Sequence, residues 1–213
     1  MQNLSKKMRG IFDMKKSLGA KTLAQPAPTW LVGTYDANGK ANIMTIAWGG
    51  ICCSSPTCVA VSLRKATYTY DAIAARRAFT VNIPSEAHVR EADYAGIVSG
   101  RDADKFAVTG LTPVRSELVD APYVAEFPLI LECRLLHTVE IGLHTQFIGE
   151  IIDVKADESV LNDKGVPDAA KVKAFSYDPG SRNYFAIGAL LAPGFTIGRE
   201  LIDDNGIKRS QSE

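Results

Sequence analysis

The dipeptide Asn38-Gly39 is the feature that most restricts how this chain can fold. It lies between two runs rich in β-branched and aromatic residues, at 29–35 and 41–48. Asn-Gly favours a two-residue hairpin turn, because both central residues of that turn need positive φ. The two runs are therefore predicted to be neighbouring antiparallel strands.

The rest of the chain has the pattern of a mainly β fold with a few short helices. Further strands are predicted at 57–63, 79–83, 129–141, 145–156 and 183–187, and helices at 68–77, 85–94, 103–108 and 167–174. In the first helix Ile73 and Ala74 are predicted to face inward, and Asp102 is predicted to cap the third. Prolines and turn residues dominate 111–127, which predicts an irregular excursion over the surface. We predict one antiparallel β-barrel with peripheral helices.

Composition excludes several classes of function. Lys and Arg together number 24, as do Asp and Glu, so the formal net charge is zero. A nucleic-acid-binding protein usually carries a basic excess, which discounts nucleic acid as a partner. No apolar stretch is long enough to span a bilayer, and the N-terminus lacks the apolar core of a secretory signal. We expect a cytoplasmic protein without a membrane anchor.

The cysteines and histidines do not form a metal-binding pattern. Cys52, Cys53, Cys58 and Cys133 make neither a zinc-type pair of pairs nor a Cys-x-x-Cys motif, and no His has a second ligand at metal spacing. Most of these cysteines lie in or beside apolar runs, where a free thiol behaves as a small hydrophobic group. A disulfide between the adjacent Cys52 and Cys53 would form a strained ring, so reduced thiols are predicted.

Segment 42–71 gives the clearest indication of a binding site. Two apolar runs flank a small-residue loop at 49–56, and the second run leads into a basic, hydroxyl-rich turn that opens a helix. A helix start leaves backbone N–H groups without partners and favours an anion. Side chains that could add donors to a bound phosphate are Ser62, Arg64, Lys65, Thr67 and Thr69. The alternative is a solvated strand-to-helix turn with an N-terminal Thr cap.

A series of motifs resembles the flavin reductase-like FMN-binding split-barrel family, and within it the flavoredoxins. The motifs are Asn42-x-Met44-Thr45-x-Ala47-Trp48, Ser54-Ser55-Pro56, Ser62-Leu63-Arg64 with Thr67 and Thr69, Phe79-Thr80-Val81-Asn82-Ile83-Pro84, Ser99-Gly100-Arg101-Asp102-x-Asp104-Lys105-Phe106, and His144-x-x-Phe147-Ile148-Gly149-Glu150. Their order and spacing carry the resemblance, which extends over 18–198. It implies an antiparallel split barrel of Greek-key type at 18–200, preceded by an extension at 1–17 and followed by a tail at 201–213.

The resemblance also implies which residues bind the cofactor FMN. They are Asn42, Met44, Thr45, Ala47, Trp48, Cys53, Ser54, Ser55, Ser62, Leu63, Arg64, Lys65, Thr67, Tyr68, Thr69 and His144. Strand 44–48 and loop 53–55 would contact the ring and ribityl chain. Alternatives stay open for three residues: Trp48 stacks on the flavin or fills the core, Asn42 bonds FMN or a neighbouring backbone group, and His144 lies near a dimer-shared site or on the surface.

Two functions are compatible with the resemblance. The first is a homodimeric FMN-dependent oxidoreductase that takes a hydride from NAD(P)H and passes electrons to free flavin or a small acceptor. It needs no protein base, because the hydride goes directly to the ring. The second is a flavoredoxin-type electron carrier that keeps FMN bound and exchanges electrons with protein partners. The chain has no Gly-x-Gly-x-x-Gly motif and no other dedicated nicotinamide-binding motif.

Overall fold

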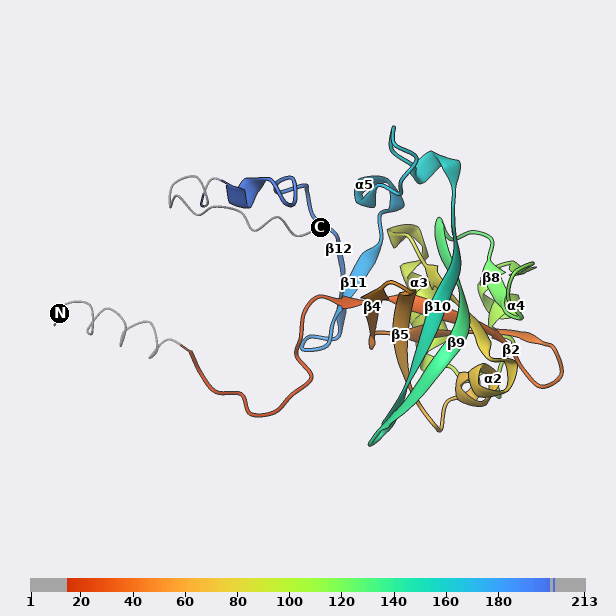
Figure 1. The fold of residues 1–213 in the computed structure, drawn as a ribbon. Coiled ribbons are helices and arrows are strands. Elements are labelled where there is room, and N and C mark those ends of the chain that lie inside the picture. The colour runs from red at the N-terminus through yellow and green to blue at the C-terminus, as the bar shows by residue number, and fades with distance from the viewer. Residues whose placement is uncertain (1–14, 200, 202–213) are drawn as a thin grey trace.

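The computed structural model describes residues 15–199 and 201 and shows a mainly β protein built around one seven-stranded sheet (Figure 1). In spatial order the strands are β3 (Ala41–Ile46), β2 (Trp30–Tyr35), β6 (Ala78–Ile83), β9 (Leu129–Ile141), β10 (His144–Ala156), β5 (Thr57–Arg64) and β4 (Gly49–Ser54). Every neighbouring pair is antiparallel. The predicted mainly β, antiparallel architecture is confirmed.

The sheet is strongly curled, as its strand order requires. β3 and β4 lie at opposite ends of the order, yet only Ala47 and Trp48 separate them in the chain. The three Cα–Cα steps from Ile46 to Gly49 span at most about 10 Å, so the two edges of the sheet must come together. The backbone N–H of Ser62 in β5 donates to the carbonyl of Trp48 at 2.8 Å. Within the described residues no ladder joins β3 to β4, so the barrel is split at this point.

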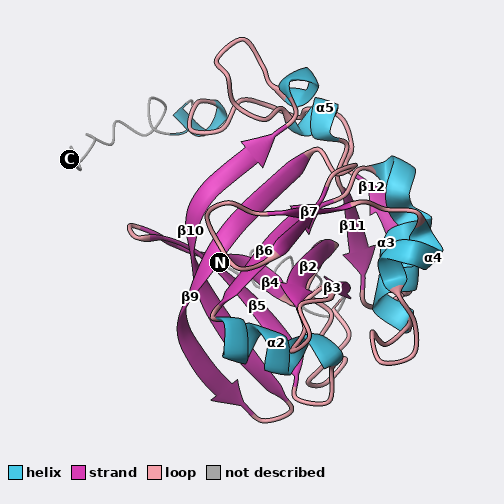
Figure 2. Cartoon of the chain, turned by 90° about the vertical axis from the view of Figure 1, so that its right-hand side faces the viewer, coloured by secondary structure: helices cyan, strands magenta, loops and turns pink. Residues whose placement is uncertain are grey.

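Smaller elements surround the sheet. They are the three-stranded sheet β1 (Ala27–Pro28), β11 (Phe175–Asp178) and β12 (Asn183–Ala186), the pair β7 (Pro113–Arg115) and β8 (Pro122–Val124), the helices α2 (Tyr68–Arg76), α3 (Val89–Ile97), α4 (Lys105–Thr109) and α5 (Ala169–Val172), and the 3-10 turns Glu86–His88, Glu158–Val160 and Ile197–Arg199. Figure 2 shows α3 and α4 together at one side of the sheet and α2 near the lower ends of its strands. Among the described residues, no helix is long and apolar enough to cross a membrane.

Hydrophobic side chains fill both faces of the central strands. One cluster, which includes Val32, Phe79 and Phe147, packs within the curled sheet. A second, which includes Leu31 and Phe106, packs between the sheet and α3 with α4. Leu31 and Val32 are consecutive in β2 and point to opposite faces, so this strand is buried on both sides.

Several details of the sequence-based expectations are wrong. Residues 49–56 are not all loop, because 49–54 form β4, which pairs with β5 through a bulge between Ile51 and Cys53. The small residues there have low intrinsic strand preference, and pairing with β5 overrides it. Strand 41–48 correspondingly ends at Ile46. The predicted irregular segment 111–127 contains β7 and β8, which pair with each other.

Two helix predictions also need correction. Ile73 is buried as predicted, but Ala74 is exposed and Ala72 is buried in its place, so the inward face of α2 lies on the other side of Ile73. Asp104, not Asp102, is the N-cap of α4, and its carboxylate accepts from the backbone N–H of Ala107 at 3.1 Å. Both errors arise because several candidate residues stand at adjacent positions, and tertiary packing selects among them.

Asn82 ties three strands together through one buried amide. Its Nδ2 donates to the carbonyl of Leu31 and to Oγ1 of Thr80, each at 2.9 Å, and its Oδ1 accepts from the backbone N–H of Val124 at 2.8 Å. The residue is fully buried. β6, β2 and β8 therefore share a polar junction that an apolar side chain could not replace.

We expect Asn82→Ala to lower the free energy of unfolding by about 3 kcal/mol, because it leaves buried backbone groups of Leu31 and Val124 without partners. Urea denaturation measures the change. Asn183→Ala, at an exposed position of β12, is the matched control and should stay within about 0.5 kcal/mol of wild type. Equal stability of the two variants would contradict this role of Asn82.

Candidate functional site

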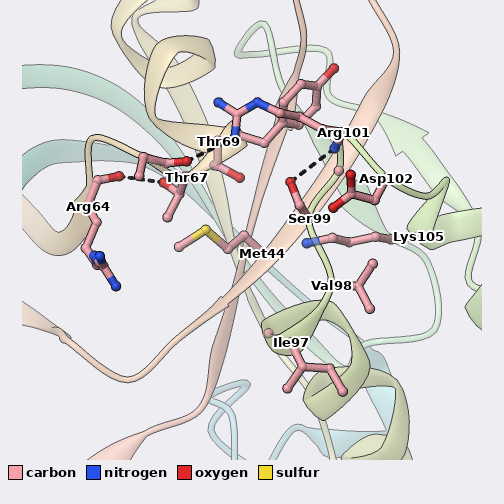
Figure 3. Close-up of a pocket in the computed structure, with 14 residues that line it drawn as sticks. Met44, Arg64, Thr67, Thr69, Ile97, Val98, Ser99, Arg101, Asp102 and Lys105 are labelled. Atoms are coloured by element: carbon pink, nitrogen blue, oxygen red, sulfur yellow. Dashed lines mark hydrogen bonds between the residues drawn. The ribbon is translucent and has the colours of Figure 1, made fainter.

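A cavity of about 430 Å³ opens between β3, the start of α2 and the loop that joins α3 to α4 (Figure 3). Its lining residues are Met44, Arg64, Ala66, Thr67, Tyr68, Thr69, Gly96, Ile97, Val98, Ser99, Gly100, Arg101, Asp102 and Lys105. Five of the residues chosen from sequence thus meet here: Met44, Arg64, Thr67, Tyr68 and Thr69. We call this space the cationic cavity, because three basic side chains line it.

The turn from β5 into α2 places Arg64 and Thr67 on one side of the cavity. The backbone N–H and the hydroxyl of Thr67 both donate to the carbonyl of Arg64, at 3.0 and 2.8 Å. Thr67 occupies the N-cap position of α2, but its side chain makes no capping bond. Thr67 lines the cavity, and its hydroxyl hydrogen is used by the carbonyl of Arg64. Among the described residues, the Arg64 guanidinium has no hydrogen-bond or salt-bridge partner, so all its donors remain available.

Asn42 and Thr69 join β3 to α2 beneath the cavity. Both side chains are buried, and Nδ2 of Asn42 donates to Oγ1 of Thr69 at 3.0 Å. The partner that Asn42 requires is thus a neighbouring side chain. Because the Thr69 hydroxyl accepts from Asn42, its own hydrogen is left to point elsewhere, and Thr69 lines the cavity. Asn42 therefore acts on the cavity through Thr69.

The opposite wall is the loop 98–102, which the sequence analysis quoted as a motif but did not include among the binding residues. Arg101 donates from its guanidinium to the carbonyl of Ala66 at 3.0 Å and lies 5.6 Å from the centre of the Tyr68 ring. The Tyr68 hydroxyl donates to Asp36 at 2.7 Å, which lowers the pKa of Asp36 and raises that of Tyr68. The signal in the sequence was the run Ser99-Gly100-Arg101, with a second basic residue, Lys105, four positions further on.

Lys105 is the most unusual side chain of the cavity. It is buried, and its ammonium donates to the carbonyls of Ile43 at 2.8 Å and Ala95 at 2.7 Å. Burial lowers its pKa to about 8. Two of its three donors are used, and in Figure 3 the side chain points toward Met44 from the side opposite Arg64. Lys105 therefore brings a positive charge to the cavity with no carboxylate paired to it in the described structure.

The charge of the cavity suits an anionic ligand. Arg64, Arg101 and Lys105 line it against the single carboxylate of Asp102, which leaves it net positive near neutral pH. A phosphate group would supply acceptors for the donors of Arg64, Lys105 and the start of α2.

Two further predicted residues line a second cavity. Thr45 and Ala47 border a space of about 380 Å³ between β3, α3 and the β11–β12 pair. Gly96 and Ile97 line both cavities, so the two spaces meet at the end of α3. Strand β3 thus presents Met44 to one cavity and Thr45 to the other, as alternate strand residues should.

The remaining predicted residues lie outside the cationic cavity. Lys65 points to Glu140, with 2.6 Å between its ammonium and the carboxylate, and that bond raises the pKa of Lys65. Leu63 is buried in the core. His144 begins β10 opposite Arg64 in the ladder. The others lie along β4, its turn and the facing part of β5: Trp48, Cys53, Ser54, Ser55 and Ser62.

Comparison with known proteins identifies the family. The profile described as flavin reductase like domain matches residues 23–171. This chain belongs to the flavin reductase-like family. The structure of the flavoredoxin of Desulfovibrio vulgaris (Miyazaki F) is 61% identical, with a TM-score of 0.84, over 87% of this chain and 100% of that one. The flavoredoxin of Methanosarcina acetivorans is 30% identical, with a TM-score of 0.80, over 88% of this chain and 98% of that one.

A third structure bears on the fold alone. It is a protein with a split barrel domain from Shewanella frigidimarina, 21% identical with a TM-score of 0.75, over 86% of this chain and 100% of that one. The likeness confirms the predicted split-barrel architecture. Membership of the flavin reductase-like family implies a flavin cofactor, and the unpaired Arg64 guanidinium and buried Lys105 ammonium fit the phosphate of a flavin nucleotide.

Lys105 gives a pH dependence that can be measured on the flavin-free protein. Its pKa is about 8 in the folded state, against 10.5 for a free lysine, so between these values the unfolded state binds more protons. The free energy of unfolding should therefore rise with pH across this window by about 3 kcal/mol, and Lys105→Met should lack this rise.

Urea denaturation at pH 7.5, 9 and 10.5 measures both profiles. Lys164→Met, at an exposed lysine, is the control and should follow the wild-type profile. Parallel pH profiles for the wild type and Lys105→Met would show that the ammonium is not held in the buried site described here.

Proposed function

We propose that this chain is a flavoredoxin-type electron carrier that keeps FMN bound in the cationic cavity. The observation that carries the proposal is the meeting of Arg64, Thr69 and Lys105 around one space at the start of α2. These groups come from three separate elements, β5, α2 and α4, and two of them are cations without a carboxylate partner in the described structure. The likeness to two flavoredoxins supports the same assignment.

In this proposal each group of the cavity has a defined task. Arg64 and Lys105 neutralise the phosphate from opposite sides, and Thr69 donates a hydroxyl hydrogen to it. Tyr68 and Arg101 stack on each other at the rim and limit access of water to the phosphate. Asn42 positions Thr69 through their hydrogen bond. Lys65 takes no part in this binding, because its ammonium is held by Glu140.

The strand from Met44 to Trp48 is proposed to contact the ring and ribityl chain. It borders both cavities, so a nucleotide anchored at Arg64 can follow this strand past Gly96 and Ile97. Backbone N–H groups along such a strand can hold negative charge on a reduced ring. Bound FMN supplies the electron-transfer chemistry itself, and the protein sets its orientation and potential.

The proposal extends to the oligomeric state and the redox partners of the carrier. We infer a homodimer in the cytoplasm that exchanges electrons with redox proteins. A second candidate, an NAD(P)H-dependent flavin reductase, is favoured by the family to which the chain belongs. The two differ in whether a nicotinamide nucleotide alone can reduce the bound flavin.

The experiment that separates the candidates is the anaerobic visible spectrum of the FMN-loaded protein. We expect the flavin bands to persist after NADH and NADPH are added and to bleach with a reduced small iron–sulfur protein as donor. Rapid bleaching by either nucleotide alone would replace the carrier by the reductase. If added FMN gave no protein-bound flavin spectrum, both candidates would be wrong.

The adjacent basic residues Arg64 and Lys65 provide a matched pair of variants that test whether Arg64 binds the phosphate of FMN. Arg64→Ala should weaken FMN binding about 10- to 100-fold, because it removes charge-assisted hydrogen bonds to a phosphate. Lys65→Ala removes the same charge one residue along the chain, and should change FMN binding by less than about threefold. Quenching of FMN fluorescence on titration with protein measures both. Equal losses in the two variants would show that only the net charge matters.

A further inference from the structure

The segment after β12 exposes apolar side chains to an extent that is unusual for a folded protein. Leu190, Leu191 and Phe195 are 88%, 98% and 99% exposed. In Figure 1 this segment, drawn in blue, leaves β12 and runs away from the barrel. We call residues 187–199 the C-terminal arm. Side chains this exposed gain nothing from their own chain, so the arm needs another surface to bury them.

Contacts within the arm are local. Its backbone N–H at Ile197 donates to Pro193 at 3.3 Å, and Nε of Arg199 donates to the carbonyl of Phe195 at 2.9 Å. The hydroxyl of Thr196 donates to the carbonyl of Gly194 at 3.4 Å, and the backbone N–H of Arg199 donates to the carbonyl of Thr196 at 2.9 Å, so these bonds too stay inside the arm. Phe195 also has a φ of 57°, in the left-handed region that bulky residues avoid. The arm is therefore shaped for packing that its own barrel does not provide.

The arm also stands away from the nearest part of the barrel. A hollow of about 660 Å³ separates its first residues, including Ile187 and Leu190, from α5 and its neighbours, including Ala170 and Ala174. The arm side of the hollow is small and apolar, whereas the side formed by α5 and its neighbours combines alanines with the charged residues Glu86, Asp168 and Lys173. The hollow is a place where a second surface can enter between the arm and α5.

The composition of the arm indicates which kind of surface it fits. Arg199 is its single basic residue, and Gly188, Pro193, Gly194 and Gly198 interrupt any long helix. A membrane-bound amphipathic segment would instead be a helix with Lys and Arg along one face. An apolar protein surface is the remaining match.

We propose that the C-terminal arm packs on a second copy of this chain and that the second copy returns its own arm, so that two exchanged arms clasp the dimer. The chain has zero net charge, so copies do not repel one another. The arm begins at β12, an open edge of the β1–β11–β12 sheet, and the unpaired backbone groups of such an edge can pair with another chain. Phe185 of β12 and five apolar side chains of the arm, from Ile187 to Ile197, are all more than half exposed, so each copy offers six such side chains to an interface.

The test compares two triple variants that each remove three exposed apolar side chains. The arm variant is Leu190→Ser, Leu191→Ser and Phe195→Ser, and the control is Val108→Ser, Leu118→Ser and Val166→Ser on the body of the molecule. Sedimentation equilibrium of the full chain gives the dimer dissociation constant. We expect the arm variant to raise it at least about tenfold and the control to change it less than about twofold. Equal constants for the two variants, or a monomeric wild type, would overturn the proposal.

A second measurement uses the otherwise unchanged chain. A photo-activatable phenylalanine analogue at position 191 should crosslink two chains, and crosslinks confined to one chain would overturn the exchange. The inference rests on the homodimer of the proposed function, but it fails separately from FMN binding. The flavin spectrum of the same samples separates the two failures. If neither the wild type nor the variants bind flavin, the proposed carrier is contradicted. If all of them bind flavin and the arm variant has the wild-type dimer dissociation constant, only the exchange of arms is contradicted.

Discussion

The two-residue connection between β3 and β4 is the constraint on which the rest of the structure depends. It forces the two ends of a seven-stranded sheet together, because Ala47 and Trp48 cannot span a flat sheet of that width. The curl brings Met44 of β3 near Arg64 at the end of β5, although twenty residues separate them in the chain. A cavity can then form where the helix α2 begins. The site is thus a consequence of how the sheet curls.

Electrostatics in the cavity favour an anionic ligand. A buried ammonium without a carboxylate partner is costly in water-excluded surroundings, and the lowered pKa of Lys105 expresses that cost. Two backbone carbonyls offset part of it. An anion that completes the coordination of Lys105 and engages Arg64 would offset more. Lys65, the residue after Arg64, is instead held in an exposed ion pair with Glu140. The positive charge of the cavity therefore comes from particular side chains and not from every basic residue of the turn.

Much of the fold could be predicted from local sequence signals, and the site only in part. The β2–β3 hairpin and the long strands β9 and β10 have strong patterns, and these strands lie where the sequence indicates. The predicted two-residue turn is wrong in detail: Tyr35 pairs with Ala41, so residues 36–40 form the connection, and of Asn38 and Gly39 only Gly39 has a positive φ. β4 was missed, because Gly, Cys and Ser acquire strand structure there only by pairing with β5. Arg64, Thr67 and Thr69 follow from the turn that opens α2. Ser99, Arg101 and Lys105 reach the same cavity because α3 and α4 pack on the sheet. This tertiary packing cannot be predicted from a local sequence pattern.

The most direct test of the central claim is the preference of the protein for FMN over riboflavin, which differ by the phosphate alone. Fluorescence titration of wild type and Arg64→Ala with both flavins gives the ratio of dissociation constants for each chain. If the cationic cavity holds the phosphate, the wild type should bind FMN at least about tenfold more tightly, and Arg64→Ala should lose most of that preference while its riboflavin affinity stays unchanged. Equal affinity of the wild type for the two flavins, or an unchanged ratio in Arg64→Ala, would contradict the assignment of this cavity.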